Sequence, residues 1–434
     1  MSPAGRLALP AVLASLLLAG GAGAEPGAVS QHVLPNGLRV LVRESASAPV
    51  VAVSLQVRGG SHFETAETAG VTNFLQRVLL RGTTKRSAVR LAEAAEDIGG
   101  RLDAAGEVES AEVRGEALAR HWEALLALVA EVALAPAFPP EEIEKERRLL
   151  LSQLRTRADN PFPAGFDALV RELYGPHPYA WPSLGRRASL ERLGREALVG
   201  RYRELYRPDR MVLAVSGQVA RARVVRAAER LFGKLERPAA AIPPPPPVPP
   251  RTAGRRVLER PVHQAHVLVG YRGPGLTEPA YPALRVLGAV LGGGMASRLF
   301  VELRDKEGLA YSVGALAPYR TGPAFLVAYL GTAPASLEAA EAGVLRELAR
   351  LRTERVGPDE LARAKAHLLG RLAMDRRTNA RRAWYLAFFE VVGAGWDFPE
   401  RYARALEAVT AEDVAAAAAR WLTGPTIIVL TPVR

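Results

Sequence analysis

Blocks of strand-like and helix-like hydrophobic pattern alternate along the first half of the chain. The segment His32–Val42 has apolar residues on both sides of Asn36-Gly37, a strong two-residue turn signal, and predicts a β-hairpin. The apolar run 50–58 predicts a buried strand. In segment 70–83 the apolar residues recur at helical spacing, which predicts a short helix that ends at Gly82. Its predicted buried face consists of Val71, Phe74, Leu75, Val78 and Leu79.

The two halves of the chain repeat one order of predicted elements. The first half continues with a strand region at 101–117, helices from 121 to about 207 and a last strand at 211–217. The second half has strands at 265–271 and 324–330, a helix at 281–291, further helices from 336 and a last strand at 426–431. This order predicts an α+β fold of two homologous domains, each with helices packed on an antiparallel-type sheet.

A run of prolines separates the two halves. Residues 243–250 read Pro-Pro-Pro-Pro-Pro-Val-Pro-Pro. Because proline has a fixed φ and no backbone N–H, the run predicts an extended, semi-rigid spacer. We therefore assign residues 25–235 to an N-terminal domain, 236–256 to a linker and 257–434 to a C-terminal domain.

The first 24 residues have the layout of a secretory signal peptide. Arg6 precedes an apolar run from Leu7 to Leu18, and small residues follow up to Ala24. We expect cleavage after Ala24 and a periplasmic or secreted protein. The apolar run is shorter than the roughly 18 residues of a membrane helix, and no later stretch reaches that length, so we expect no transmembrane segment. The chain has no cysteine, which excludes disulfides, thiolate metal sites and a cysteine nucleophile.

Composition and charge exclude only a few classes of function. A chain of 434 residues with 49% hydrophobic content can bury a large core. The net charge of +12 would suit nucleic acid or an anionic surface, but the arginine excess is spread over both halves. We therefore expect no nucleic-acid partner, and a preference for acidic peptides or anionic surfaces stays open.

The candidate chemistry lies at positions 73, 76 and 77 of the predicted helix. The cadence Gly-x-x-x-Phe-Leu-x-x-x-Leu-x-Arg-Gly-Thr over 70–83 resembles the active-site helix of the pitrilysin/insulinase peptidases. In that family an inverted zinc motif, His-x-x-Glu-His, opens at the fourth residue. The two His residues bind zinc one turn apart, and the Glu takes a proton from metal-bound water. Here the motif reads Asn73-Phe-Leu-Gln76-Arg77.

None of these side chains can take over the roles that the resemblance implies. Asn73 offers a neutral amide oxygen, Gln76 cannot accept a proton near neutral pH, and Arg77 has a fixed positive charge and no lone pair. The third ligand of the family is a Glu on a charged helix, and it corresponds to Gln153, 76 residues after Arg77. We therefore interpret the four positions as a vacated zinc site and expect this chain to bind no metal or other cofactor.

The second half contains the more specific match to this family. Residues 292–313 read Gly-Gly-Gly-Met-Ala-Ser-Arg-Leu-Phe-Val-Glu-Leu-Arg-Asp-Lys-Glu-Gly-Leu-Ala-Tyr-Ser-Val. In the family an Arg and a Tyr seven residues apart reach toward the zinc of the opposing domain and hold the substrate's carbonyls. Here these positions are Arg304 and Tyr311, and a guanidinium and a phenol both suit charge that develops on a carbonyl oxygen.

A further match falls on the stretch 99–104. It resembles the family's edge strand, which usually reads Gly-Gly-x-x-Asn-Ala and binds substrate by strand addition. In this chain Asp103 replaces the Asn and precedes Ala104. That replacement leaves the substrate-binding role of the strand open.

The resemblance implies a non-catalytic, substrate-binding subunit of a heteromeric zinc metalloendopeptidase. In this hypothesis a homologous partner carries the zinc and the intact motif, as in paired bacterial members of the family and in mitochondrial processing peptidase. This chain supplies Arg304 and Tyr311, and the substrates are peptides. The alternative is a proteolytically inactive peptide-binding or scaffold protein of the same fold. A zinc peptidase with unrecognised ligands is the third hypothesis.

Overall fold

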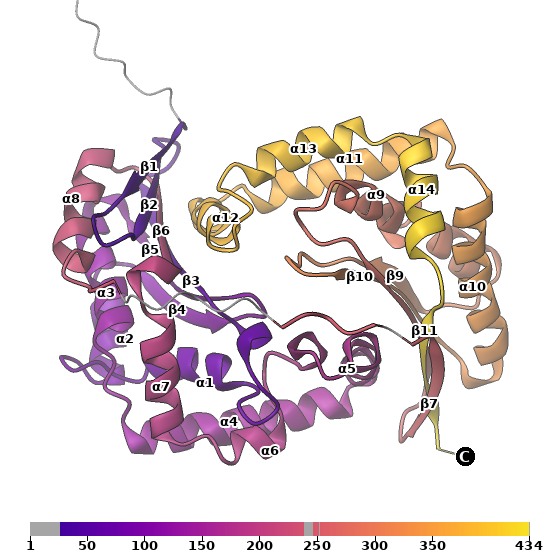
Figure 1. Cartoon of the computed structure of the whole chain (residues 1–434), viewed down its shortest axis with the longest axis horizontal. Coiled ribbons are helices and arrows are strands. Elements are labelled where there is room, and N and C mark those ends of the chain that lie inside the picture. The colour runs from indigo at the N-terminus through magenta and orange to yellow at the C-terminus, as the bar shows by residue number, and fades with distance from the viewer. Residues whose placement is uncertain (1–26, 238–245, 251, 434) are drawn as a thin grey trace, which may run out of the picture.

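The computed structural model describes residues 27–237, 246–250 and 252–433. The predicted signal peptide and residues 238–245 and 251 of the predicted linker lie outside the described residues. The described part forms two halves, each built around one β-sheet, that lie side by side (Figure 1). No helix in the described ranges combines the length and the apolar character that a membrane crossing requires.

The first half is built on a six-stranded sheet in the order β1-β2-β6-β3-β5-β4. Its central strands β3 and β6 are buried along almost their whole length, as expected for strands with layers on both faces. The strands are β1 (Val29–Val33), β2 (Arg39–Glu44), β3 (Val50–Arg58), β4 (Arg101–Gly106), β5 (Ser110–Leu118) and β6 (Met211–Gly217). The helices are α1 (Val71–Leu79), α2 (Ala88–Glu96), α3 (Trp122–Leu134), α4 (Pro140–Asp159), α5 (Pro161–Tyr174), α6 (Arg187–Leu190), α7 (Arg195–Leu205) and α8 (Arg221–Phe232).

The second half is built on a five-stranded sheet in the order β7-β11-β8-β10-β9. Strand β7 begins at Gly254, before the domain start predicted at 257, because it pairs in parallel with β11 from that residue onward. The strands are β7 (Gly254–Arg260), β8 (Ala265–Gly273), β9 (Ser312–Leu316), β10 (Ala324–Thr332) and β11 (Thr426–Pro432). The helices are α9 (Tyr281–Gly292), α10 (Leu337–Thr353), α11 (Pro358–Asp375), α12 (Asn379–Val391), α13 (Phe398–Ala408) and α14 (Ala411–Trp421).

The two sheets share one topology. The order β2-β6-β3-β5-β4 in the first sheet matches β7-β11-β8-β10-β9 in the second, strand for strand. In each sheet the first of these pairs is parallel and the others are antiparallel. The parallel pair arises because the last strand of each half returns beside an early one, β6 beside β2 and β11 beside β7. The duplicated α+β fold with helices packed on mainly antiparallel sheets is thus confirmed.

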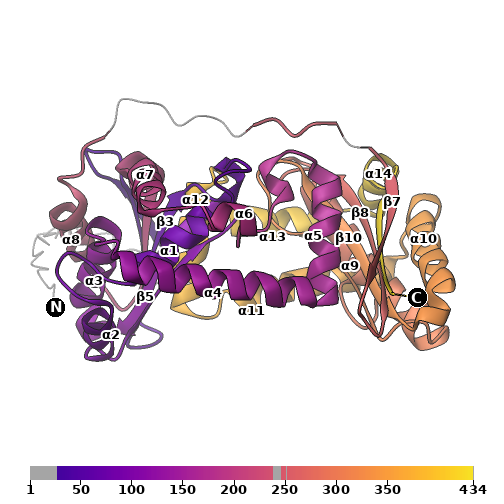
Figure 2. The same cartoon turned by 90° about the horizontal axis from the view of Figure 1, so that it is seen from below.

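One helix of each half packs on the sheet of the other half. Helix α5 of the first half packs on β8 and β11, whereas α12 of the second half packs on β3 and β6. These strands occupy equivalent places in the two sheets, so the exchange is symmetric. Helix α4 runs from the first half toward the second and leads into α5 (Figure 2).

Small and apolar residues make both exchanged contacts close. Leu169 and Leu173 of α5 are buried against the second sheet. A Cβ atom at Gly165 would lie 2.7 Å from Leu430 Cδ1, so a larger residue would require the Leu430 side chain to shift. In α12 the small residues Ala383 and Ala387 are fully buried against the first sheet. Each half therefore has its own large hydrophobic core, and two smaller clusters of buried residues, around α5 and around α12, join the halves.

A buried carboxylate joins the halves at a second place. Glu109, between β4 and β5, is 3% exposed, and its Oε1 accepts a hydrogen bond from the Tyr179 hydroxyl. The same oxygen accepts bonds from the backbone N and the hydroxyl of Thr321, at 2.7 and 2.8 Å, and Thr321 lies between β9 and β10. Because the groups are buried, removal of one partner would leave an uncompensated polar group.

His62 beside this contact makes the stability depend on pH. Its side chain is buried, and Nδ1 lies 2.7 Å from Val108 O. Burial lowers the pKa of His62 from 6.5 to about 4, although the neighbouring Glu109 opposes that shift. Between these two values the unfolded chain binds a proton that the folded chain does not bind. The contribution of His62 to the free energy of unfolding should therefore fall by roughly 2 kcal/mol as the pH drops from neutral to about 4.5.

Urea unfolding near pH 7.5 and near pH 4.5 checks this expectation. His62→Gln should reduce the difference in unfolding free energy between the two pH values by roughly 2 kcal/mol, because glutamine does not titrate. The exposed His263 provides the matched control, since His263→Gln should leave the difference unchanged. Equal pH dependence in the His62 variant and the wild type would refute the prediction.

Candidate functional site

Helix α1 is fixed at its start and along one face. The carboxylate of Glu64 accepts hydrogen bonds from the backbone N–H groups of Gly70 and Thr72, at 2.6 and 2.8 Å, where a helix has free donors. The predicted apolar face of α1 is buried, as expected from the pattern. These two constraints set the direction of the polar side chains at positions 73, 76 and 77.

Arg77 joins the positions that the sequence singles out. Its Nε donates a hydrogen bond to Asn73 Oδ1 at 3.2 Å, and its Nη2 donates one to Gln153 Oε1 at 2.6 Å. Gln153 comes from α4, so residues far apart in the chain meet across the gap between the two helices. The guanidinium of Arg77 thus lies between the side chains at 73 and 153.

The end of strand β4 closes the same site. Asn73 Nδ2 donates a hydrogen bond to Gly106 O at 3.2 Å. A Cβ atom at position 106 would lie 2.7 Å from Asn73 Cα, so glycine is required for this close approach. The edge strand β4 therefore ends directly beside the helix turn that carries Asn73.

The side chain of Gln76 points into the protein, away from the residues that contact Arg77. Its side chain is fully buried, and its Oε1 accepts a hydrogen bond from the Tyr206 hydroxyl at 3.0 Å. Among the described residues, Nε2 of Gln76 has no hydrogen-bond partner. A neutral amide in this place neither takes up nor releases a proton.

Glu146 is a member of the site that the sequence interpretation missed. It is 1% exposed, forms an ion pair with Arg81 at 2.5 Å and lies 3.5 Å from Arg77 Nη1. Glu146 precedes Gln153 by two helical turns on α4, so the spacing alone places both side chains on one face. That spacing was the signal that could have identified it.

The residues at this site do not fit a zinc ion. A ligand position requires a lone pair, which Asn73 and Gln153 offer only as neutral amide oxygens and Arg77 does not offer at all. The one carboxylate present, Glu146, is already paired with two guanidiniums. Across the described residues, no group of three or more His, Cys, Asp or Glu side chains is placed to hold a metal.

Strand β4 forms the free edge of the first sheet. It pairs on one side with β5 and has no strand on the other side. Asp103 forms an ion pair with Arg114 of β5 and also accepts a hydrogen bond from Ala104 N at 2.9 Å. The Asp103 side chain is thus held by its own sheet, and at the end of the strand Gly106 O is bonded to Asn73.

Arg304 and Tyr311 lie at the surface of the second half. Arg304 belongs to the π-helical segment η5 (Phe300–Lys306), and its guanidinium lies 4.7 Å from the centre of the Phe300 ring. Tyr311 is 76% exposed, and its backbone N–H bonds to Gly331 O at 3.0 Å. In the described part of the chain, neither side chain has a carboxylate or hydroxyl partner. Both are therefore free to contact another molecule.

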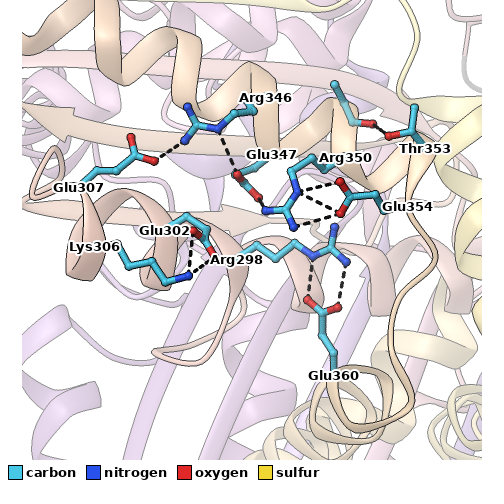
Figure 3. A network of polar contacts seen from close by, with 11 residues as sticks. Arg298, Glu302, Lys306, Glu307, Arg346, Glu347, Arg350, Thr353, Glu354 and Glu360 are labelled. Carbon is cyan, nitrogen blue, oxygen red and sulfur yellow. Dashed lines mark hydrogen bonds and ion pairs between the residues drawn. The ribbon is translucent and has the colours of Figure 1, made fainter.

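A network of ion pairs holds η5 and its flanks on α10 and α11 (Figure 3). Arg298, just before η5, binds both carboxylate oxygens of Glu360 on α11, at 2.8 and 2.9 Å. Glu307, just after η5, pairs with Arg346 of α10 at 2.5 Å. Fixed at both ends, η5 presents Arg304 on a rigid base.

The structure brings together only the first set of candidate residues. Asn73, Arg77 and Gln153 are in contact, and Gln76 lies on the same helix turn. Among the described residues, no hydrogen bond or ion pair joins these positions to Arg304 or Tyr311. The two motifs thus form separate surfaces on different halves of the molecule.

The two motifs fall within matches to two different family models. The family described as "Insulinase (Peptidase family M16)" matches residues 39–185, and the family described as "Peptidase M16 inactive domain" matches residues 192–368. A Mycobacterium tuberculosis protein named an uncharacterized zinc protease is 31% identical over 396 residues, which cover 89% of each chain. A Bacillus subtilis protein of the same description is 27% identical over 354 residues, covering 81% of this chain and 86% of that one.

Solved structures share the fold. A protease from Helicobacter pylori superposes with a TM-score of 0.88 at 21% identity, covering 94% of this chain and all of that chain. A peptidase M16 inactive domain from Pseudomonas fluorescens superposes with a TM-score of 0.86 at 23% identity, covering 94% of this chain and 98% of that one. At these identities the likeness concerns the fold alone.

Proposed function

Because the chain belongs to the insulinase family, peptidase family M16, we propose that it is the non-catalytic, substrate-binding subunit of a heteromeric zinc metalloendopeptidase. Its partner is a homologous subunit that holds the zinc ion and the general base. This chain binds peptides and supplies Arg304 and Tyr311 to the shared site. In line with its N-terminal 24 residues, we propose that the complex works in the periplasm or outside the cell.

The observation that carries this proposal is the place of Arg77. Its guanidinium lies between Asn73 and Gln153 and approaches Glu146, so the region where a family member would hold zinc is filled by a cation with three partners. The guanidinium of Arg77 already occupies this region, so a metal ion cannot bind there. Hydrolysis by a zinc-dependent mechanism then requires the metal of another chain.

Arg304 and Tyr311 support a role beyond that of a scaffold. A purely structural role does not require an arginine without a carboxylate partner or a tyrosine that is 76% exposed. Donors of this kind stabilise negative charge on a substrate oxygen when they are held in place beforehand. The ion pairs on both sides of η5 hold Arg304 in that way.

Reconstitution with an intact-motif homologue tests the proposal. The chain and the homologue are purified separately, and zinc content and cleavage of a quenched fluorescent peptide are measured for each and for the mixture. We expect no zinc and no cleavage for this chain alone. We expect the mixture to cleave the peptide at least about tenfold faster than the homologue alone, because each half site lacks groups that the other provides.

The other outcomes separate the remaining hypotheses. Cleavage by this chain alone that a chelator abolishes would refute the proposal and indicate an unrecognised zinc site. A homologue that is fully active alone would favour the alternative, a proteolytically inactive peptide-binding or scaffold protein of the same fold. Size-exclusion chromatography of the mixture shows in each case whether the two chains associate.

A further inference from the structure

A cavity of about 750 Å³ lies in the second half, away from α1 and its site. Side chains from α9, α11, α12 and α13 and from the β9–β10 hairpin line it, and Phe166 of the exchanged helix α5 contributes from the first half. These helices surround the hairpin on one side of the second sheet (Figure 1). The cavity is open to solvent and is large enough for several atoms of a small ligand.

The inner part of the cavity contains an arginine without a counter-ion. Arg285 of α9 is half-buried, and its Nη1 donates a hydrogen bond to the Tyr281 hydroxyl at 3.0 Å. Its guanidinium lies 5.0 Å from the centre of the Tyr319 ring. Among the described residues, no carboxylate lies within ion-pair distance of Arg285. A partly desolvated cation of this kind gains most from an anion that enters the cavity.

An unused hydroxyl belongs to a residue that lines the same cavity. Tyr402 of α13 lines it, is 4% exposed, and its hydroxyl has no hydrogen-bond partner among the described residues. Burial raises the pKa of Tyr402 well above its ordinary value, so the hydroxyl keeps its proton and remains a donor. A buried donor without a partner costs free energy in the ligand-free protein, and a ligand oxygen would remove that cost.

The remaining charges of the cavity are also mainly positive. Arg371, Arg377 and Arg381 contribute guanidiniums, and Asp375 is the only acidic residue in the lining. The carboxylate of Asp375 is occupied, because it pairs with Arg381 at 2.5 Å and accepts a hydrogen bond from the Tyr385 hydroxyl at 2.7 Å. The cavity therefore favours an anion and offers no free carboxylate to a cation.

Apolar side chains are exposed at the cavity. Leu316 of β9 is 38% exposed and Met374 of α11 is 59% exposed, and both belong to the lining. Phe166 and Phe325 add aromatic surface. A ligand that places a carboxylate at Arg285 and apolar groups along these side chains would satisfy both features, and a peptide has both.

We propose that this cavity binds a carboxylate group of a peptide, with Arg285 as the charge partner and the Tyr402 hydroxyl as a second donor. The carboxylate belongs either to the C-terminus or to an acidic side chain. The inference rests on the proposed function in that the ligand is a peptide, but it requires neither zinc nor a partner subunit.

Fluorescence anisotropy of the purified chain without a partner tests the inference. The probe is a short fluorescein-labelled peptide of Ala, Leu and Ser in three forms: with a free C-terminal carboxylate, with a C-terminal amide, and with an amide plus one internal Glu. We expect the free carboxylate or the Glu form to bind about tenfold more tightly than the plain amide. The tighter of the two identifies the source of the carboxylate.

Two variants test the roles of the residues. Arg285→Gln should bring the affinities of all three probes to within about twofold of one another, because the charge partner is lost. Tyr402→Phe should weaken the favoured probe about threefold without lowering the melting temperature, because the hydroxyl has no partner to lose. Arg420→Gln is the matched control, since Arg420 also lies on an aromatic ring, that of Trp421, but outside the cavity.

Three results would overturn the inference. They are equal binding of all three probes by the wild type, no binding of any of them, and a preference for the carboxylate that survives in both variants. The reconstitution experiment is independent of this assay. A chain that prefers the carboxylate but does not stimulate a homologue would contradict the proposed function and leave the cavity assignment standing.

Discussion

The combined substitution Asn73→His, Gln76→Glu, Arg77→His and Gln153→Glu is expected to give this chain a zinc site. The contacts of Arg77 with Asn73 and Gln153, at 3.2 and 2.6 Å, place the three ligand positions around one point. Two imidazoles one turn apart and a carboxylate from α4 then supply three ligands, as in catalytic zinc sites. Removal of the Arg77 charge also removes the repulsion of a cation.

Metal analysis after dialysis against zinc and then against buffer measures this effect. We expect about one zinc ion per chain in the variant and none in the wild type. A matched triple variant keeps Gln76 and changes only positions 73, 77 and 153. It should bind zinc equally well, because the buried side chain at 76 is directed toward Tyr206 and not toward the three ligand positions. A folded quadruple variant without zinc would show that the positions do not converge well enough.

Arg304→Gln and Tyr311→Phe are expected to reduce cleavage by the reconstituted pair by about 100-fold each. The reduction should fall mainly on kcat, because donors aimed at a developing negative charge act more strongly in the transition state than on the bound peptide. Neither change should lower stability. Tyr311 is 76% exposed, and among the described residues the Arg304 guanidinium lies on the Phe300 ring without an ion-pair partner.

Steady-state kinetics of the mixture, with thermal unfolding of each variant, checks this second expectation. Arg420→Gln is the control, because Arg304 and Arg420 each lie 4.7 Å from the centre of an aromatic ring. Its activity should equal that of the wild type. Full activity with both Arg304 and Tyr311 replaced would mean that the partner stabilises the substrate by itself, and this chain would then be a scaffold.

Some features of the site around α1 could be predicted from the sequence, and others could not. Residue types alone excluded a metal ligand at position 77, since an arginine has no lone pair in any fold. The contact of Arg77 with Gln153 followed from the family resemblance. The ion pairs of Glu146 with Arg77 and Arg81 did not, because they depend on the angle between α1 and α4.

In the second half, too, some features could be predicted from the sequence and others could not. The pattern predicted β8, α9, β10 and β11 closely, because their hydrophobic periodicity is local. Strand β7 escaped prediction, since Gly254-Arg-Arg has no strand-like apolar pattern and the strand pairs with β11, which is distant in sequence. The Arg298–Glu360 and Arg346–Glu307 pairs join elements that are distant in sequence.

The sequence by itself determined most of the elements, the duplication and the absence of the family's His and Glu side chains at positions 73, 76, 77 and 153. Each of these depends on local periodicity or on the functional groups of single residues. The tertiary structure alone decided which sheet each apolar helix covers, and so produced the exchange of α5 and α12. It also brought Arg285 and Tyr402 to the lining of one cavity. Burial of an apolar face against either sheet gains similar free energy, and electrostatic pairing depends on distance in space, so neither outcome is encoded in local sequence.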